Sequence, residues 1–448
     1  MSKNNSNLTV IILAAGKGSR MRSSLPKVCH PIGGLPMLGH VLQTALDLNP
    51  QQIITVISPQ TPEVKAIADH FSSTIAYQIL QEGTGHAVIS AMTELKNEHS
   101  DILVIYGDTP LLQSSTLKAM VEKQQKTEAD VVVMSMRLQD AGAYGRIFLD
   151  EQERPYAIIE SRDATPEQLK NPMANSGVML ISGKHRQALL EKLNKNNAQN
   201  EYLLTDVIRY AFESGLNTAH YEGEISELLG VNNRIDLSHC EQDFQNRRRH
   251  QAMESGVTLI DPQSVTFSYD TKIATDVTIQ PQVFFGPKVS IDSFTTVLSH
   301  CHIEGATIGK HCTIGPFARI RPTTILDDHA KVGNFVEIKN THLHAHAKAN
   351  HLSYIGDADV GEKANIGAGT ITCNYDGYAK HKTQIGKGVF IGSNSALVAP
   401  VTIGDGAVIG AGSVITKPVT PDALSFSRSP QQELALGAQR YRKKKSVN

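Results

Sequence analysis

The chain has 448 residues, and its 43 lysine and arginine residues nearly balance its 44 aspartate and glutamate residues, for a formal net charge of -1. This length exceeds what one hydrophobic core usually serves, so we expect at least two domains. The balanced charge excludes the overall basic field that is typical of nucleic-acid-binding proteins, which leaves small molecules and further copies of the chain as the expected partners.

The N-terminal stretch "MSKNNSNL" is polar, and no apolar run approaches the roughly 20 residues that a membrane-spanning helix needs. We therefore expect neither a signal peptide nor a membrane span. The cysteines are odd in number and show neither C-x-x-C pairing nor the spacing of metal ligands, which is typical of reduced thiols and predicts a cytoplasmic protein. They are Cys29, Cys240, Cys301, Cys312 and Cys373.

The stretch "TVIILAAGKGSRMRSSLPK", residues 9–27, predicts a buried strand followed by a turn that either binds an anion or is a plain connection with solvated basic residues. Residues 10–13 are apolar and β-branched, as in a strand buried on both faces. Gly16 and Gly18 let backbone N–H groups approach a bound phosphate. The nearby cations are Lys17, Arg20 and Lys27. Met21 stands where the dinucleotide fingerprint needs a third glycine, and the P-loop spacing is absent, so neither a dinucleotide oxidoreductase nor a P-loop ATPase fits.

Apolar runs alternate with helix-like segments from about residue 8 to residue 233. The runs that predict strands are residues 52–58, 101–108, 130–138 and 176–182, and helical spacing of apolar residues occurs in residues 62–71 and 114–125. This rhythm predicts a Rossmann-like α/β domain, in which a mostly parallel sheet carries helices on both faces. Ligands of such sheets bind beyond the carboxyl ends of strands, where Gly16 and Asp108 both lie.

After about Gly256, aliphatic or aromatic residues recur at nearly every sixth position. The series are Ile279, Phe285, Ile291, Val297 and Ile303; then Ile308, Ile314, Ile320, Leu326, Val332 and Ile338; and then Ile385, Ile391, Leu397, Ile403, Ile409 and Ile415. A period of six cannot stay on one face of an α-helix, but it fits a triangular coil of three short strands, which predicts a parallel β-helix of hexapeptide repeats. Two interruptions, residues 342–354 and 373–384, are expected to be loops on the binding face.

The segment between these halves, residues 236–256, is charged and contains no proline or glycine before its last residue, which predicts a linking helix. We therefore expect an α/β domain over residues 1–235 and a β-helix domain over residues 257–448, joined by that helix. The basic C-terminal residues, 439–448, are interpreted as a solvated tail.

Several motifs are similar to those of one enzyme family. "LAAGKGSRMRSSLPK" resembles the signature of the sugar-nucleotide pyrophosphorylases. With "EGTGHA", "YGDTPLL", "GVNNR", "GPFARIRP", "GNFVEIK", "NHLSYIGDA" and "NIGAGTITCNYDG", the chain from residue 8 to residue 428 resembles the bacterial bifunctional N-acetylglucosamine-1-phosphate uridyltransferase / glucosamine-1-phosphate acetyltransferases. The resemblance implies a left-handed β-helix, a homotrimer, and synthesis of UDP-N-acetylglucosamine as a precursor of peptidoglycan and lipopolysaccharide.

For the N-terminal half, the resemblance implies uridylyl transfer from UTP to N-acetylglucosamine 1-phosphate with release of pyrophosphate. Such chemistry depends on positioning and charge neutralisation rather than on a protein nucleophile. Arg20 and Lys27 are the implied catalytic residues, and Asp108 and Asn233 are the implied ligands of Mg2+. The implied contacts to UTP and the sugar nucleotide are Leu13, Ala14, Ala15, Gly16, Lys27, Gln78, Gly83, Thr84, Tyr106, Gly107, Asp108, Gly145, Glu160, Asn175 and Asn233.

For the C-terminal half, the resemblance implies acetyl transfer from acetyl-CoA to the amine of glucosamine 1-phosphate. The amine attacks only when neutral, so a base must accept its proton, and His351 is the implied base. Glu337 is expected about two coils away, where it would orient His351, and Asn374 is the candidate oxyanion donor. The implied contacts to glucosamine 1-phosphate are Arg321, Lys339, Tyr354 and Asn365. Those to acetyl-CoA are Ala368, Asn374, Tyr375, Ser393, Ala411 and Arg428.

His342, His344 and His346 form an H-x-H-x-H pattern that in a strand would place three imidazoles on one side, as in a zinc cluster. We favour a solvated loop instead, because the acyltransferase motifs surround His351. Two functions compete with a two-activity enzyme: a single-activity nucleotidyltransferase with a regulatory or oligomerising β-helix, and a non-catalytic trimeric scaffold. The first alternative does not explain the set His351, Asn374 and Lys339, and the second does not explain Arg20, Lys27 and Asp108.

Overall fold

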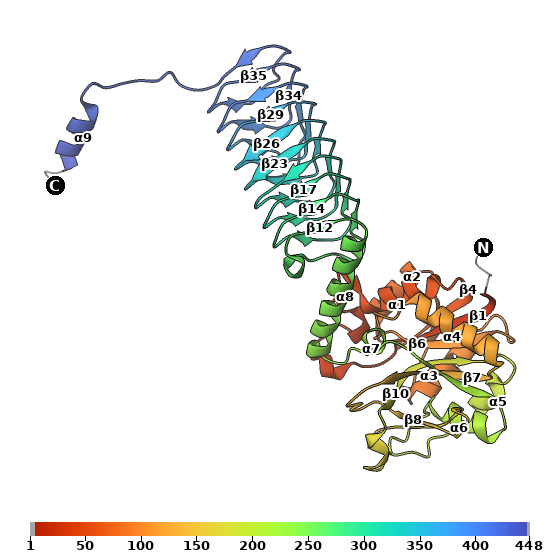
Figure 1. The fold of residues 1–448 in the computed structure, drawn as a ribbon. Coiled ribbons are helices and arrows are strands. Elements are labelled where there is room, and N and C mark those ends of the chain that lie inside the picture. The colour runs from red at the N-terminus through yellow and green to blue at the C-terminus, as the bar shows by residue number, and fades with distance from the viewer. Residues whose placement is uncertain (1–4, 446–448) are drawn as a thin grey trace. The chain divides into compact units, whose positions relative to one another are not determined.

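The computed structural model describes residues 5–445, and the chain divides into two compact units between Gln245 and Asn246. Figure 1 shows a sheet flanked by helices in the first unit and stacked short strands in the second. The dividing point falls inside helix α8 (Arg234–Glu254), whereas the sequence suggests boundaries at the two ends of a helix over residues 236–256. Within residues 5–445, no helix has both the length and the apolar character that crossing a lipid bilayer requires.

The first unit contains a nine-stranded sheet. Its strands are β1 (Asn5–Leu13), β4 (Pro50–Ile57), β5 (Thr74–Tyr77), β6 (Asp101–Tyr106), β7 (Val131–Arg137), β8 (Arg146–Leu149), β9 (Pro155–Ile159), β10 (Met173–Ile181) and β11 (Thr218–Glu222). The central order is β11-β7-β10-β6-β1-β4-β5, and β8 pairs with β10 and β9. Strands β5, β4, β1 and β6 are parallel, and β10 runs antiparallel to β6 and β7, which confirms the predicted Rossmann-like sheet.

Helices cover both faces of this sheet, because alternate residues of its central strands enter different cores. Val10 and Ile12 pack in one core, and Ile11 between them packs in the other. On the side of Val10 lie α1 (Met37–Leu46), α2 (Pro62–His70), α4 (Ser114–Thr127) and α7 (Ile225–Leu228). On the side of Ile11 lie α3 (Thr84–Met92), α5 (Arg186–Glu191) and α6 (Asp206–Glu213).

Short elements hold the basic residues that follow β1. Two 3-10 turns, Ser19–Met21 and Lys27–Cys29, carry Arg20 and Lys27, and the pair β2 (Pro31–Ile32) and β3 (Leu35–Pro36) comes directly after them. Two further 3-10 turns are Gln168–Lys170 and Pro262–Ser264. Arg20 and Lys27 therefore each start from a short hydrogen-bonded turn between β1 and α1.

The second unit is a prism of three parallel strand stacks, and the chain passes from one stack to the next in turn. Stack 1 contains β12 (Thr258–Leu259), β14 (Thr278–Ile279), β17 (Thr296–Val297), β20 (Thr313–Ile314), β23 (Lys331–Asn334), β26 (Lys348–His351), β29 (Asn365–Ile366), β32 (Phe390–Ile391), β35 (Val408–Ile409) and β37 (Leu424–Ser425). Stack 2 contains β15 (Phe284–Phe285), β18 (His302–Ile303), β21 (Arg319–Ile320), β24 (Glu337–Lys339), β27 (Tyr354–Gly356), β30 (Ile371–Cys373), β33 (Ala396–Val398) and β36 (Val414–Ile415). Stack 3 contains β13 (Lys272–Ile273), β16 (Ser290–Ile291), β19 (Ala306–Ile308), β22 (Thr324–Leu326), β25 (His342–Leu343), β28 (Ala358–Val360), β31 (Thr383–Ile385) and β34 (Val401–Ile403).

The core of this left-handed β-helix consists of the residues with the six-residue period. Every member of the three predicted series is buried, with no more than 4% of its surface exposed. The prediction that residues 342–354 form a loop is wrong, because Leu343, Ala349 and Ile355 continue the core on β25, β26 and β27. Leu343 follows Ile338 by five positions instead of six, so one shorter step conceals the period in the sequence. The second interruption is an inserted loop, residues 374–382, between β30 and β31.

Helix α8 contributes to the cores of both units separately. Cys240 and Phe244 pack in a small core of the first unit, and Arg249 donates to the carbonyl oxygen of Val265 (2.9 Å) in the second. Part of the basic tail forms helix α9 (Gly437–Lys445), whose residues 439–444 are exposed; residues 446–448 lie outside the described part of the chain.

The cysteines are free thiols, and all but Cys373 are buried. Burial raises the pKa of Cys29, Cys301 and Cys312 to about 11, which keeps these thiols protonated near neutral pH. They therefore act as small apolar side chains in the two cores, as expected for thiols that remain reduced.

Ile409 and its neighbour Val408 provide a matched test of the predicted core. Ile409 is fully buried, whereas Val408 is 40% exposed on the outside of β35. We expect Ile409→Ala to lower the free energy of unfolding by about 2–5 kcal/mol, because it leaves a cavity in a packed core. Val408→Ala should change it by less than about 0.5 kcal/mol. Urea unfolding followed by circular dichroism measures both, and equal destabilisation would contradict the inward position of Ile409.

Candidate active sites

A pocket of about 490 Å³ lies where β1 and β6 end. Leu13 and Tyr106, the last residues of these strands, are partners in the parallel register, and Gly107 donates its N–H to the carbonyl oxygen of Leu13 (3.0 Å). The carboxyl ends of the two strands are therefore held together. The predicted residues that line the pocket are Leu13, Ala14, Ala15, Gly16, Lys27, Gln78, Gly83, Thr84, Tyr106 and Asp108.

One wall of the pocket is the segment from β5 to α3. Gln78 donates to the carbonyl oxygen of Gly83 (3.0 Å), and Gln81 donates to that of Ala15 (2.5 Å), which ties this segment to the turn after β1. Gly83 has a φ of 104°, and a Cβ there would lie 2.5 Å from the carbonyl oxygen of Tyr202, so the position requires glycine. Lys17, a cation of the predicted turn, also lines the pocket, and the lining residues that the sequence analysis did not name are Val28, Gln81, Ala87 and Glu201.

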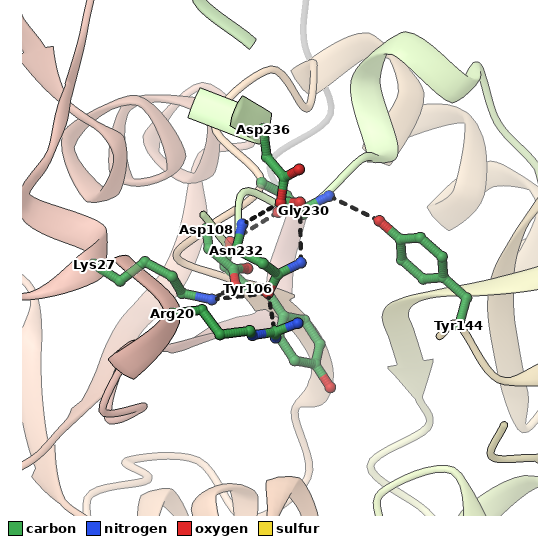
Figure 2. Close-up of polar contacts among 9 residues, drawn as sticks. Arg20, Lys27, Tyr106, Asp108, Tyr144, Gly230, Asn232 and Asp236 are labelled. Atoms are coloured by element: carbon green, nitrogen blue, oxygen red, sulfur yellow. Dashed lines mark hydrogen bonds and ion pairs between the residues drawn. The ribbon is translucent and has the colours of Figure 1, made fainter. Parts of the chain in front are cut away.

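Basic and acidic groups converge at this pocket (Figure 2). Lys27 donates to Asp108 Oδ2 in an ion pair whose side chains are only 14% and 18% exposed. The same ammonium lies 3.4 Å from Asn232 Oδ1, and Arg20 donates to that oxygen as well (2.9 Å). Two cations thus share the amide oxygen of Asn232 beside the carboxylate of Asp108.

The segment that carries Asn232 is held by three backbone hydrogen bonds (Figure 2). Asp236 Oδ2 accepts from the N–H of Asn232 (2.9 Å), and the hydroxyl of Tyr144 accepts from that of Gly230 (3.1 Å). The N–H between them, that of Val231, donates to the carbonyl oxygen of Asp108 (2.9 Å). These bonds fix the side chain of Asn232 toward Asp108.

Asn233, the expected metal ligand, has a different role in this structure. Its Oδ1 accepts from the N–H groups of Ile235 (2.8 Å) and Asp236 (2.9 Å), the hydrogen bonds of an N-cap at the start of α8. The oxygen that faces Asp108 belongs to Asn232, so the assignment of Asn233 is corrected by one position. The motif "GVNNR" contains both asparagines, and it does not distinguish the cap from the site residue.

The oxygens of Asp108 and Asn232 fit a hard divalent cation. Both atoms are within hydrogen-bond reach of one positive group, the ammonium of Lys27, so they already point at a common place occupied by positive charge. One carboxylate and one amide oxygen form a donor set that suits Mg2+, which keeps much of its hydration and binds substrate phosphates.

Three further predicted residues form a group next to Tyr106. Asn175 donates its N–H to the carbonyl oxygen of Gly145 (2.8 Å), and a Cβ on Gly145 would lie 3.5 Å from Glu160 Oε2. Burial raises the pKa of Tyr106, and the negative charges of Glu160 and Asp108 raise it further. A Cβ on Gly177, two residues after Asn175, would lie 2.7 Å from the ring of Tyr106, so Tyr106 connects the strand of Asn175 to the first pocket.

The second candidate site follows one edge of the prism, between stacks 1 and 2. Backbone hydrogen bonds join successive coils there: Gly369 N–H to the oxygen of His351 (3.3 Å), Asn394 N–H to that of Ala368 (2.7 Å), and Gly412 N–H to that of Ser393 (2.8 Å). Arg428 donates to the oxygen of Ala411 (2.5 Å). The structure therefore brings His351 into one line with predicted acetyl-CoA contacts: Ala368, Ser393, Ala411 and Arg428.

The group that contacts the imidazole of His351 is Asn334, at the paired position of the preceding coil. His351 Nδ1 lies 2.7 Å from Asn334 Oδ1. An amide oxygen only accepts, so Nδ1 carries the proton and Nε2 keeps a lone pair. The expectation that Glu337 orients His351 is wrong: Glu337 lies one coil before Tyr354, not two coils from the site, and binds Arg321 (2.8 Å).

Predicted contacts to glucosamine 1-phosphate lie along stack 2, with one exception. Arg321, Lys339 and Tyr354 follow one another there, and the Lys339 ammonium lowers the pKa of Lys380, a residue of the inserted loop that the sequence analysis did not single out. Two neighbouring ammonium groups form a place suited to an anion. Asn365, by contrast, is on stack 1 beside Lys348.

Asn374 lies at the start of the inserted loop and is buried. Its Nδ2 donates to Asp357 Oδ2 and to the hydroxyl of Tyr354 (3.4 Å), so the N–H groups expected to bind an oxyanion have partners within the chain. Tyr375, next in sequence, donates to the carbonyl oxygen of Gly377 (2.6 Å) and is exposed. The loop is closed by Asp376, which accepts from the N–H groups of Tyr378 (2.8 Å) and Ala379 (2.7 Å).

The three histidines of the H-x-H-x-H pattern do not lie on one side. His342 and His344 are neighbours, with ring centroids 3.8 Å apart, whereas His346 turns the corner of the prism with a φ of 62° and stacks on His329 (4.6 Å). The expected solvated loop is also wrong here, because His342 belongs to strand β25.

Comparisons with known proteins agree with this two-part architecture. Residues 10–205 match the family described as "MobA-like NTP transferase domain", and residues 305–340 and 382–417 match "Bacterial transferase hexapeptide (six repeats)". A protein named "Bifunctional protein GlmU" from Paramagnetospirillum magneticum is 48% identical over 438 residues, which cover 98% of this chain and 97% of the relative. Proteins of the same name from Zymomonas mobilis and Sphingopyxis alaskensis are each 44% identical, with coverage of 98% and 98% for the first and 89% and 88% for the second.

Glu160 should make stability depend on pH. Burial raises its pKa, although a hydrogen bond from Thr205 (3.1 Å) opposes the shift. Its contribution to stability is therefore complete below the unfolded-state pKa of about 4.3 and is lost as pH rises through the higher folded-state value. We expect Glu160→Gln to raise the melting temperature at pH 7.5 and to change it little at pH 4. Thermal unfolding of the exposed-site control Glu151→Gln should show no such difference, and a pH-independent effect of Glu160→Gln would contradict the shift.

Proposed function

The chain belongs to the family of bifunctional GlmU proteins, and we propose that it makes UDP-N-acetylglucosamine in two reactions at two separate sites. The β-helix domain, residues 257–448, transfers the acetyl group of acetyl-CoA to the amine of glucosamine 1-phosphate. The α/β domain, residues 1–235, then transfers the uridylyl group of UTP to N-acetylglucosamine 1-phosphate and releases pyrophosphate. Helix α8 (Arg234–Glu254) joins the two domains.

The observation that carries the uridylyl transfer is the convergence of Lys27, Asp108 and Asn232 at the first pocket. Asp108 and Asn232 supply oxygen ligands to Mg2+, which when bound neutralises phosphate charge. Lys27 then exchanges its ion pair with Asp108 for the phosphates of UTP, and Arg20 stands beside it. No protein nucleophile is needed, because the phosphate of the sugar attacks the α-phosphorus directly.

The sugar phosphate is held by the group next to Tyr106. Glu160 and the amide of Asn175 bind sugar hydroxyl groups, and the bare backbone at Gly145 leaves room for the ring. Support comes from the hydrogen bond between Asn175 and Gly145 and from the short approach of Glu160 to Gly145. The uracil and ribose lie along the turn after β1, against Gln78, Gly83 and Thr84.

Acetyl transfer uses His351 as the general base. Because Nδ1 donates to Asn334, Nε2 is the atom that takes the proton from the amine as it attacks the thioester. Arg321, Lys339 and Lys380 bind the phosphate of the acceptor. The edge formed by Ala368, Ser393 and Ala411 runs from His351 along the prism, which suits an extended CoA chain with its thioester at the histidine.

The acceptor site needs more than one copy of the chain. Asn365 projects from stack 1, whereas Arg321, Lys339 and Tyr354 belong to stack 2, so one prism presents these contacts on different faces. Packing of prisms side by side brings stack 1 of one copy toward stack 2 of the next, and three copies close such a ring. We therefore propose a homotrimer. A cytoplasmic location fits the free thiols and the nucleotide substrates.

Separate loss of the two activities tests the proposal. We expect Asp108→Asn to abolish pyrophosphate release and to leave acetyl transfer unchanged, because it removes the carboxylate that binds the cation. We expect His351→Ala to lower acetyl transfer by about 10²–10⁴-fold and to leave pyrophosphate release unchanged. Pyrophosphate release from UTP and thiol release from acetyl-CoA measure the two reactions.

Two results would contradict this assignment. Loss of both activities in each variant would show that the sites are not independent. Absence of acetyl transfer in the unmodified chain would leave a single-activity nucleotidyltransferase whose β-helix serves only assembly or regulation.

The adjacent asparagines offer a matched pair of variants. We expect Asn232→Ala to slow uridylyl transfer and to raise the Mg2+ concentration needed for half-maximal rate, with little change in stability. Asn233→Ala should keep the rate but lower the free energy of unfolding by about 1 kcal/mol, because it removes the cap of α8. Initial rates against Mg2+ and urea unfolding separate these effects. The reverse pattern would make Asn233 the ligand after all.

A further inference from the structure

Two histidines and two aspartates form a cluster on the outer face of stack 3. His342 on β25 and Asp359 on β28 are paired positions of neighbouring strands. Asp327 and His344 each come one residue after the core position that ends β22 and β25. Side chains alternate across a strand, so all four polar groups project from the same outer surface in adjacent rows.

Asp327 lies between the two imidazoles. Its Oδ1 is 2.9 Å from His342 Nε2, and its Oδ2 is 3.3 Å from His344 Nδ1. One ligand atom from each of the three residues lies within 4.8 Å of the others. Atoms that share a tetrahedral ion at about 2.0–2.1 Å are about 3.3 Å apart, and the two contacts of Asp327 with the imidazoles are near that spacing.

The orientation of the imidazole of His342 relative to Asp327 supports an ion bound between the two side chains. His342 Nε2 is shielded from solvent and, within the described residues, makes no hydrogen bond, although Asp327 Oδ1 is close enough for one. The oxygen therefore lies off the axis of the ring nitrogen. Two ligands of one ion are arranged in this way, because each points at the ion and not at the other ligand.

The position of the proton on His344 also supports an ion between His344 and Asp327. Its Nε2 lies 3.0 Å from Asp359 Oδ1, and a carboxylate only accepts, so the proton of the neutral ring is on Nε2. The lone pair of Nδ1 then faces the carboxylate of Asp327, which is repulsive unless a cation lies between them. A second proton on His344, bound to Nδ1, is the alternative, and the metal titration below distinguishes it from an ion.

We propose that Asp327, His342 and His344 bind one divalent transition-metal ion of the zinc class, with water as the fourth ligand. Two imidazoles and a carboxylate are ligands that favour Zn2+ and its first-row neighbours over Mg2+ or Ca2+, which prefer oxygen alone. Asp359 does not bind the ion. It positions His344 by accepting from Nε2, as carboxylates do behind metal-bound histidines.

The ion would brace the inserted loop. Asp359 Oδ2 lies 3.4 Å from Lys382 Nζ, and His342 and Asp359 line a cavity of about 650 Å³ together with Lys380, His381 and Lys382 of that loop. The contacts from the ion to His344, from His344 to Asp359 and from Asp359 to Lys382 thus connect the ion to the inserted loop, residues 374–382. The site is structural, and none of its four residues takes part in the reactions proposed above.

Metal binding by the full chain tests this inference. Protein freed of metal with a chelator, then kept in excess Mg2+ to occupy oxygen sites, is titrated with Co2+ and read by its visible absorption. We expect about one equivalent per chain with the intense bands of four-coordinate Co2+, displaced by Zn2+. His342→Gln/His344→Gln should lose these bands, and Asp359→Asn should bind about 10–100-fold more weakly.

The matched control removes the two stacked histidines His329 and His346, which lie at the adjacent corner of the prism. His329→Gln/His346→Gln should bind Co2+ as the unmodified chain does, and circular dichroism should show that every variant is folded. Unchanged binding in the His342→Gln/His344→Gln variant would overturn the proposal. So would the absence of stoichiometric four-coordinate Co2+ in the unmodified chain, which would leave the cluster as ion pairs of protonated histidines. If Asp359→Asn bound Co2+ with the affinity of the unmodified chain, the proposed positioning role of Asp359 would be wrong.

Discussion

Parallel pairing of strands with buried aliphatic side chains is the constraint on which both units depend. In the first unit, pairing of β1 with β6 brings Leu13 and Tyr106 level, so the glycine turn and Asp108 meet where both strands end. In the second unit, pairing within the stacks places equivalent positions of successive coils in rows. A row at one edge contains His351 and Ala368, which are distant from the first pocket in sequence and share no residue with it.

In each site, most of the charged side chains are paired with partners within the chain. Lys27 is paired with Asp108, Arg321 with Glu337, and Asn374 donates to the carboxylate of Asp357. Such pairs keep basic side chains ordered without a ligand, and a phosphate can replace the internal partner at limited electrostatic cost. The pair Lys339 and Lys380 differs, since two like charges lie together. An anion bound there would offset the repulsion between the two ammonium groups.

The six-residue period and the strand-turn pattern determined much of this protein from sequence alone. A period of six excludes a helix and requires inward side chains from three short strands, and every predicted core residue is buried. Glycine and lysine after a buried strand likewise predicted the turn at the first pocket, because only the end of such a strand exposes backbone N–H groups. These features are local, and each depends on residues that are close in the chain.

Only the tertiary structure decided which side chain of several similar ones occupies a site. Asn232 and Asn233 are equivalent in sequence, and the start of α8 makes one a cap and turns the other toward Asp108. Asn334 contacts His351 because the two are paired positions of neighbouring coils on stack 1, whereas Glu337 lies on stack 2 and pairs with Tyr354. His344 contacts Asp327, whereas His346 lies at the corner of the prism and stacks on His329. Which residues pair between two coils depends on the number of residues in the chain between them. A short motif contains no information about that number.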